Sequence, residues 1–408
     1  MNDKKYAELI IKEALAVQKR ENPILWINAN TENLPFAREL TKMAYECGAA
    51  EVKVNINDEV LSRLNMEGMS EERLAHFGEY KLDERMDYIK DGVAFISITG
   101  SDPDLFKGID PKRLQIRNRA SSKVMKPAMK YTMNDINSWT VVGYPTKAWA
   151  KNVFPDLDED EAFERLKTEI FKTVRLDHED PVAAWEEHLD KLAKRGEVLN
   201  NLQLKELHYK TDRGTDFKIG LPENHIWVGA ESKDDRGYRF LPNLPTEEIF
   251  TAPDNRVAEG IVYATKPLNL SGSLVEDFWI RFEGGKAVEV GAKKGEDQLK
   301  ELISRDEGAC RLGEVALVSV KSPINTSGLI FYNTLFDENA SCHLALGAAY
   351  PTCVEGGVDM NDEELKAHGI NDSQIHDDFM IGDETLSIVG IDKDGKEHQI
   401  FKNGDFVI

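Results

Sequence analysis

The side chains best suited to bind cations gather in the last third of the chain. Glu338 and His343 lie five residues apart among small and apolar residues, which let a substrate or a second backbone approach closely. His376 and Asp378 are spaced so that an extended chain places both side chains on one face. Carboxylates and imidazoles are common ligands of divalent ions, so this part of the chain indicates a metal-binding site.

Two further carboxylates precede these four side chains in the sequence. Glu314 stands at the start of the apolar run 315–318, which predicts a strand. The second is Glu247 or Glu248, both in the stretch 245–250, whose pattern is typical of an exposed turn that enters a strand. Taken singly, each residue also has an ordinary structural explanation, such as a hydrogen-bonded histidine or a surface glutamate. Asp337 or Glu338 could equally cap a helix.

Taken together, these two histidines and four carboxylates are the set that a two-metal hydrolase requires. Carboxylates bridge and neutralise two cations, imidazoles fill terminal positions, and water takes the open ones. A donor set rich in oxygen and without thiolates suits zinc, cobalt, manganese or magnesium. The set of residues therefore indicates a two-metal hydrolase.

Other catalytic motifs are missing from the sequence. There is no G-x-G, no phosphate-binding loop, no serine with glycine at both −2 and +2, and no H-E-x-x-H. Cys342 beside His343 suggests a thiol nucleophile, but adjacent side chains point to opposite faces of a strand. Cys342 is therefore expected to be a buried structural cysteine. The chain's 4 cysteines form no C-x-x-C pair and are expected to be reduced.

The elements that must position these residues differ between the two halves of the chain. Helical periodicity at 5–19 and 33–47 alternates with apolar, strand-like runs at 23–27, 51–56 and 92–98. Such alternation predicts a mostly parallel sheet. We therefore expect an α/β N-terminal domain.

From about residue 200 the apolar periodicity shifts toward two. Asp180 and Pro181 predict the start of a helix and Gly196 its end. Strand-like runs at 278–282 and 287–290 flank a Gly-Gly turn, and the run 386–389 precedes an Asp-Gly turn. The sequence thus predicts an N-terminal α/β domain at 1–198 and a strand-rich α+β catalytic domain at 199–408.

The charge balance limits the partners. The 408 residues carry 51 basic and 73 acidic side chains, for a net charge of −22. This charge disfavours nucleic acids and anionic membranes as partners and leaves cations and free amines open. No apolar run is long enough to span a membrane, and the N-terminus does not read as a signal peptide, so a cytoplasmic location is expected.

Four motifs of the second half, in this order, resemble the aminopeptidase T/PepS family of dinuclear metallo-aminopeptidases. They are Asn-Leu-Pro-Thr-Glu-Glu-Ile-Phe-Thr-Ala-Pro (243–253), Gly-Glu-Val-Ala-Leu-Val (313–318), Asp-Glu-Asn-Ala-Ser-Cys-His-Leu-Ala-Leu-Gly-Ala-Ala-Tyr (337–350) and His-Asp-Asp-Phe-Met-Ile-Gly (376–382). The long third motif is highly specific, and the resemblance extends over most of the chain.

The resemblance implies roles for individual residues. Glu314 matches the carboxylate that bridges two metal ions, and Tyr350 matches a tyrosine that assists catalysis. Glu314 is also our first choice for the group that accepts the proton of the attacking water. The remaining matches are metal ligands: Glu248, Glu338, His343, His376 and Asp378.

The implied activity is a metal-dependent aminopeptidase that releases N-terminal amino acids from peptides through a metal-activated water. Its cofactor would be two divalent metal ions, its substrates peptides with a free N-terminal amine, and its assembly a homodimer. Two alternatives remain open on the same scaffold. One is a dinuclear metal hydrolase that acts on another amide or ester, and the other is a non-catalytic peptide-binding protein.

Overall fold

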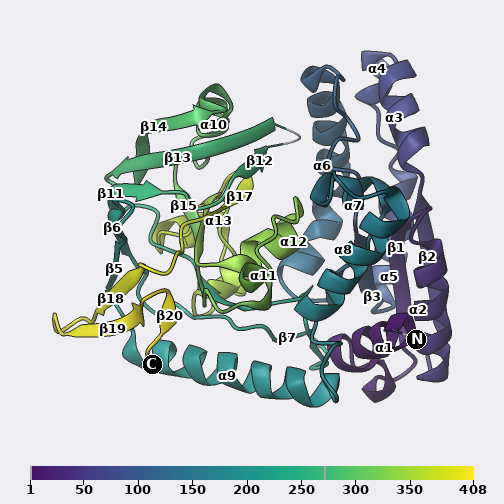
Figure 1. Ribbon diagram of the computed structural model, residues 1–408, viewed down its shortest axis with the longest axis horizontal. Helices are drawn as coiled ribbons and strands as arrows, with labels where there is room; N and C mark the ends of the chain where they lie inside the picture. Colours follow the sequence, from purple (N-terminus) through teal and green to yellow (C-terminus); the bar gives the residue numbers. More distant parts are fainter. Residues whose placement is uncertain (1, 271–272) are drawn as a thin grey trace. The chain divides into compact units, whose positions relative to one another are not determined.

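The computed structural model describes residues 2–270 and 273–408 (Figure 1). The chain forms two compact units, Met1–Trp185 with Glu231–Pro245, and Glu186–Ala230 with Thr246–Ile408. The polypeptide thus leaves the first unit, returns to it for a short segment, and leaves it again. The expected domain boundary at 198/199 lies within the long helix that connects the units, and it stays a prediction.

The first unit contains a five-stranded parallel sheet in the order β2-β1-β3-β4-β9. This confirms the parallel α/β arrangement expected from alternating strands and helices. Its elements are α1 (Asn2–Leu9), β1 (Ile24–Asn30), α2 (Leu34–Glu46), β2 (Glu51–Asn57), α3 (Glu59–Gly68), α4 (Glu71–Leu74), α5 (Tyr80–Lys90), β3 (Ala94–Thr99), α6 (Pro111–Met133), β4 (Trp139–Gly143), α7 (Lys147–Val153), α8 (Glu159–Thr173), β7 (Ser232–Lys233), β8 (Arg239–Phe240) and β9 (Asn243–Leu244).

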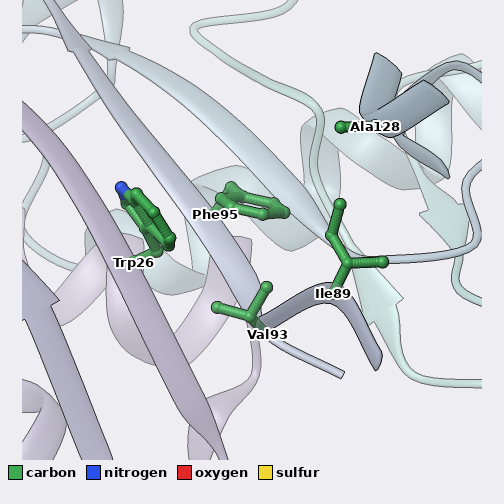
Figure 2. Packing of buried hydrophobic residues seen from close by; sticks show 5 residues of the cluster. All are labelled: Trp26, Ile89, Val93, Phe95 and Ala128. Atoms are coloured by element: carbon green, nitrogen blue, oxygen red, sulfur yellow. The ribbon is translucent and has the colours of Figure 1, made fainter. Parts of the chain in front are cut away.

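Apolar side chains of neighbouring strands and helices build the core of this unit. Trp26 of β1 and Phe95 of β3 pack with Ile89 of α5, with Val93, and with Ala128 of α6 (Figure 2). The helices α5 and α6 therefore cover the sheet face that carries Trp26 and Phe95. Because strand side chains alternate between faces, the other face is available to α2, which contacts β1 and β2.

The second unit is rich in antiparallel strands, as the change in periodicity predicts. One sheet follows the order β12-β13-β11-β6-β5-β18-β19-β20 with β14 beside β13, and a second has the order β10-β15-β16-β17. Its elements are β5 (Glu206–Lys210), β6 (Asp216–Gly220), β10 (Glu248–Thr251), β11 (Ala258–Tyr263), β12 (Leu268–Leu270), β13 (Ser273–Glu283), β14 (Lys286–Lys294), α10 (Glu296–Leu302), β15 (Leu312–Val318), α11 (Pro323–Thr326), α12 (Thr334–Asp337), β16 (His343–Gly347), α13 (Asp362–Ala367), β17 (His376–Met380), β18 (Ser387–Ile391), β19 (Glu397–Lys402) and β20 (Asp405–Phe406).

The connecting helix α9 (Pro181–Leu202) begins as expected and ends later than expected. The Asp180 carboxylate accepts hydrogen bonds from the backbone amides of Val182 and Ala183. Gly196, however, does not end the helix. The buried face that includes Leu192 continues past Gly196 to Leu199, which is fully buried. Packing of this face outweighs the roughly 1 kcal/mol that a glycine costs inside a helix.

Both hairpins expected in the second unit are present. β13 and β14 pair across the Gly284-Gly285 turn, and β18 and β19 pair across the turn that contains Asp394 and Gly395. Within the described residues, no helix is long and apolar enough to cross a bilayer.

Candidate metal centre

One face of the sheet β10-β15-β16-β17 carries the predicted site. In this antiparallel sheet Glu248 is paired with Val318, and Glu314 with Ala345. His343 and Asp378 continue the same face, since His343 is paired with Ala316 and Asp378 with Ala345. Because side chains alternate along a strand, these registers place the four polar side chains on one face, and His376 joins them two residues before Asp378.

The distances divide these side chains into two groups. His343 Nε2 lies 3.2 Å from Glu248 Oε2 and 3.5 Å from Glu314 Oε1. His376 Nε2 lies 3.4 Å from Glu314 Oε2 and 3.5 Å from Asp378 Oδ1. Each group brings three ligand atoms within 4.8 Å of one another, and Glu314 belongs to both. The two carboxylate oxygens of Glu314 thus face different groups, which is the geometry of a bridging ligand.

Small residues leave room between these side chains. Ala345 is the cross-strand neighbour of both Glu314 and Asp378, and Gly347 is the neighbour of His376. Gly347 has φ +109°, and a Cβ there would lie 2.1 Å from the carbonyl oxygen of Ile375. Any larger residue at this position would displace the chain that leads into β17, so the glycine fixes how closely His376 approaches the sheet.

Backbone carbonyls orient both imidazoles. His343 Nδ1 lies 3.2 Å from the Ser341 carbonyl oxygen, and His376 Nδ1 lies 2.7 Å from the Ala348 carbonyl oxygen. A carbonyl oxygen only accepts hydrogen bonds, so Nδ1 carries the proton in each ring. Nε2 then points toward the carboxylates, which is the arrangement that prepares a histidine to bind a metal.

The buried carboxylates give the cluster an excess of negative charge, which bound cations would compensate. Burial raises the pKa of Glu248, and burial together with repulsion from Glu248 and Asp378 raises the pKa of Glu338 well above its ordinary value. Burial opposes ionisation of Glu314 as well, but contact with His343 and His376 outweighs it and lowers the pKa of Glu314 to about 2. Glu314 is therefore the carboxylate of the cluster that stays ionised most readily.

The two imidazoles respond in the opposite sense. Burial alone would lower the pKa of each ring, but the carboxylates around them raise the pKa of His343 and His376 well above the ordinary value. Glu248 Oε2 and Asp378 Oδ1 are nevertheless buried without a hydrogen-bond partner among the described residues. Buried carboxylate oxygens of this kind are paired or bind cations, so the donor set fits divalent metal ions.

Glu338 lies beside the two groups rather than in either of them. It occupies a short 3₁₀ turn, η3 (Glu338–Ala340), and its pKa responds to Glu248, Asp378 and Glu314. The neighbouring Asp337 has a structural role, since its carboxylate accepts hydrogen bonds from the backbone amides of Phe331 (2.8 Å) and Asn333 (3.1 Å). Of the two acidic neighbours, Glu338 is therefore the one that belongs to the cluster.

Asn339 is a positioning residue that the sequence reasoning missed. Its fully buried side chain accepts a hydrogen bond from the Glu247 backbone amide (2.7 Å) and donates to the Leu335 carbonyl (3.0 Å). It thereby ties the start of β10, which carries Glu248, to the turn that carries Glu338. Its place directly after Glu338 in the long motif is the one signal that could have pointed to it.

The expectation of an exposed turn before β10 is wrong. Residues 244–249 are all buried, including Glu247 and Glu248. The two glutamates diverge, because the Glu247 carboxylate lies 3.7 Å from His188 Nε2 whereas Glu248 faces His343. The segment is held inside by Asn339 and by the polar cluster, and neither partner is visible in the local sequence pattern.

Tyr350 and Cys342 have different relations to the cluster. The Tyr350 ring lies 5.4 Å, centroid to centroid, from the His376 ring, and burial raises the pKa of its hydroxyl. Cys342 is fully buried, and its thiol exchanges 3.4 Å hydrogen bonds with the backbone of Val318. Burial also raises the pKa of Cys342 to about 12, so this cysteine is structural, as expected.

Comparison with known proteins agrees with this geometry. The sequence model of the thermophilic metalloprotease (M29) family matches residues 2–406. Aminopeptidase PepS of Streptococcus thermophilus is 44% identical over 408 residues, which cover 100% of this chain and 98% of the relative. Aminopeptidase 2 of Geobacillus stearothermophilus is 43% identical over 402 residues, or 98% of this chain and 97% of the relative.

A solved structure shows the same fold. Wild-type AmpT from Thermus thermophilus superimposes with a TM-score of 0.93 at 38% sequence identity, over 100% of this chain and 99% of that one. The resemblance inferred from the four motifs is thereby confirmed. The chain belongs to the thermophilic metalloprotease (M29) family, together with aminopeptidases T and PepS.

Proposed function

We propose that this protein is a metal-dependent aminopeptidase that releases N-terminal amino acids from peptides by hydrolysis. The observation that carries the proposal is the pair of ligand groups joined by Glu314 on one buried sheet face. Family membership supports it, since relatives named as aminopeptidases match almost the whole chain. Carboxylates that served only the stability of the fold would not be buried together in such number, because each one costs free energy unless a cation compensates it.

The two groups would hold two divalent ions. Glu248, Glu314 and His343 form one ligand set, and Glu314, His376 and Asp378 form the other. Ions bound there would supply the Lewis acidity that activates a water and polarises the scissile carbonyl. Zinc, cobalt, manganese and magnesium all suit this donor set, and their supply decides among them as much as the ligands do.

The acidic character of the site also suits the substrate. A peptide with a free N-terminus carries a positive α-amine, and a carboxylate outside the two ligand sets is available to bind it. Glu338, which the family resemblance matches to a metal ligand, lies beside both groups, and metal content in Glu338→Gln distinguishes that role from contact with the amine. Such a contact would align the first peptide bond with the cluster, which explains why only the N-terminal residue would be released.

The reaction needs a proton acceptor and a donor to the developing oxyanion. Glu314 is the acceptor suggested from sequence, and contact with His343 and His376 keeps it ionised. The neutral Tyr350 hydroxyl, next to His376, would donate a hydrogen bond to the oxyanion. Metal content measured in Glu338→Gln shows whether Glu338 is a ligand, since a lost ligand lowers it, whereas Glu314→Gln should lower it because Glu314 belongs to both sets.

Chelation gives the direct test. Activity on an aminoacyl p-nitroanilide should disappear after dialysis against EDTA and return on adding zinc or cobalt. The same enzyme should cleave a peptide with a free N-terminus and leave its N-acetylated form intact. Activity that persists in chelator would refute the metal-dependent mechanism.

The two alternatives give other outcomes. Equal cleavage of the acetylated and free peptides would indicate a dinuclear hydrolase of another amide or ester. Metal-dependent peptide binding without turnover would indicate a non-catalytic peptide-binding protein. The two ligand groups favour an enzyme over the binding protein, and the relatives named as aminopeptidases favour peptides over another amide or ester.

The family resemblance also supports a homodimer, which light scattering of the purified protein tests. The cytoplasmic location expected from the sequence stays a prediction.

A further inference from the structure

A second candidate binding site lies in the first unit, where residues of α2 and of the edge strand β2 line a pocket. It is a pocket of about 380 Å³, a size within the range of small-ligand sites. Its floor is apolar and consists of Leu34 and Ala37 of α2 with Val54 and Ile56 of β2. No role is assigned to these residues by the chemistry of the metal centre, whose ligands all belong to the second unit.

Two cations flank the apolar floor. Arg38 and Lys42 lie one helical turn apart on α2, and both are among the residues that line the pocket. Within the part of the chain that the structure describes, neither forms an ion pair with a carboxylate. Like charges at this spacing repel each other, and an anion between them would relieve the repulsion. In a chain with a net charge of −22, such a pair points to an anionic ligand.

Among the described residues, β2 pairs with one strand only, so its other side is an edge of the sheet. β2 is the end strand of the sheet, and the backbone amide of Val52 faces outward, because it donates to the Tyr45 hydroxyl at 3.3 Å. The Asn57 carbonyl faces inward, because it accepts from the Thr31 amide at 3.0 Å.

Backbone groups alternate sides along a parallel strand, so Val54 and Ile56 present their amide and carbonyl groups outward, as Val52 does. Their side chains enter the pocket at the same time. No strand of the described residues pairs with this side of β2, so an extended segment could join it as a further strand.

We propose that this pocket and the adjoining outer edge of β2 form a groove that binds the carboxyl-terminal end of a peptide in extended conformation. The terminal carboxylate would pair with Arg38 and Lys42, an apolar side chain would fill the floor, and the peptide backbone would hydrogen-bond to the outer edge of β2. A fatty acid would satisfy the cations and the floor but not the strand edge, and an inorganic anion only the cations. A peptide C-terminus satisfies all three features.

Peptide binding in the groove requires no metal, so it is tested separately from the proposed aminopeptidase activity. It does fit that activity, since every substrate and every shortened product of an aminopeptidase keeps its carboxyl terminus. The groove would bind peptides at the end that the catalytic reaction does not alter.

Fluorescence anisotropy with a labelled, N-acetylated pentapeptide that ends in Val-Leu and a free carboxylate tests the proposal. Acetylation blocks hydrolysis, so only binding is measured. Charge-assisted hydrogen bonds contribute about 1.5–3 kcal/mol, so the C-terminal amide form should bind at least about tenfold more weakly. Equal affinity of the acid and amide forms would overturn the proposal.

Paired variants locate the site. Arg38→Gln with Lys42→Gln should weaken binding of the free-acid peptide by at least about tenfold. Arg119→Gln with Lys123→Gln is the matched control, because this pair is also an arginine and a lysine one turn apart, on the exposed surface of α6. Both double variants should keep full activity on an aminoacyl p-nitroanilide, which has no peptide carboxylate. Unchanged binding in the first double variant, or an equal loss in the control, would refute the assignment.

Backbone methylation of the peptide tests strand pairing without any change to the protein. In an extended strand alternate amides face the partner, so N-methylation at every second residue should abolish binding in one register and spare it in the other. Equal affinity of the two methylated peptides would refute the strand-pairing geometry. Displacement of the probe by decanoate as effectively as by the unlabelled peptide would also refute it, and would indicate a site for apolar anions.

Discussion

Two central strands, one in each unit, are largely buried and use that burial differently. β3 in the first unit reads Ala-Phe-Ile-Ser-Ile-Thr, and its buried positions are all apolar. β15 in the second unit is buried at every position, yet one of these positions is Glu314. An apolar strand stabilises the fold by burying hydrocarbon. A buried carboxylate opposes folding unless it is compensated, so β15 is built for chemistry at the expense of stability.

Two histidines of the second unit show the same difference between burial in a core and burial in a site. His225 and His343 are each only 1% exposed. Burial lowers the pKa of His225, whereas Glu248 and Glu314 overcome burial and raise the pKa of His343 well above its ordinary value. Equal burial thus gives opposite shifts, because carboxylates lie next to His343. The surroundings of a buried polar residue, more than its depth, distinguish a site from a core.

The strongest test of the contrast between β3 and β15 removes the charge from the second. Glu314→Gln keeps the shape of the side chain, but the neutral amide cannot bridge cations or accept a proton. We expect kcat/KM on an aminoacyl p-nitroanilide to fall by about 10²–10⁴ or more. Asp377→Asn is the matched control, because Asp377 precedes Asp378 on β17 and its side chain points to the opposite sheet face. Equal losses of kcat/KM in both variants would mean that activity does not depend on the sheet face that carries Glu314.

Tyr350 tests whether the site extends beyond the charged side chains. Tyr350→Phe keeps the ring against His376 and removes only the hydroxyl. Loss of one hydrogen-bond donor to an oxyanion costs about 10²–10³ in kcat, and KM should change little. Tyr263→Phe, a tyrosine of β11 in the same unit, serves as the control and should retain wild-type kcat. A Tyr350→Phe enzyme with wild-type kcat would restrict the chemistry to the ligand groups.

Much of this architecture could be predicted from the sequence, because local patterns determine it. Alternating apolar strands and helices predicted the parallel sheet, and the Gly284-Gly285 turn predicted the hairpin of β13 and β14. The H-x-D spacing placed His376 and Asp378 on one face because it depends only on the two-residue period of a strand.

Features that depend on distant partners could not be predicted. The turn before β10 looked exposed, and it is buried because Asn339, almost a hundred residues later, binds the Glu247 amide. Gly196 looked like a helix end, but the helix continues past it because burial of the face that includes Leu199 stabilises it. The pairing of Glu314 with two histidines likewise arises from sheet register, which strand periodicity alone does not provide.

A core substitution in the first unit tests the other side of the comparison. Ile96 of β3 is fully buried, and Ile96→Val removes one methylene without adding a polar atom. The free energy of unfolding, measured with urea, should fall by about 0.5–1.5 kcal/mol. Activity per folded molecule should stay at the wild-type level, because β3 contributes packing and no ligand. A proportionate loss of kcat in this variant would show that the strand does more than stabilise the fold.

The smallest expected effect concerns the histidine that has no carboxylate beside it. His225 Nδ1 donates to the Pro222 carbonyl at 2.9 Å, and burial keeps its pKa below that of an exposed imidazole. Below the ordinary pKa of about 6.5 the unfolded chain therefore binds a proton that the folded chain excludes, so stability falls as the pH falls. In His225→Asn an amide donor takes the place of Nδ1–H without titrating. The variant loses ring packing at every pH, but its deficit in unfolding free energy relative to wild type should shrink between about pH 7 and 5. A deficit that stays constant or grows would mean that His225 is protonated in the folded protein, and that its surroundings resemble those of His343 after all.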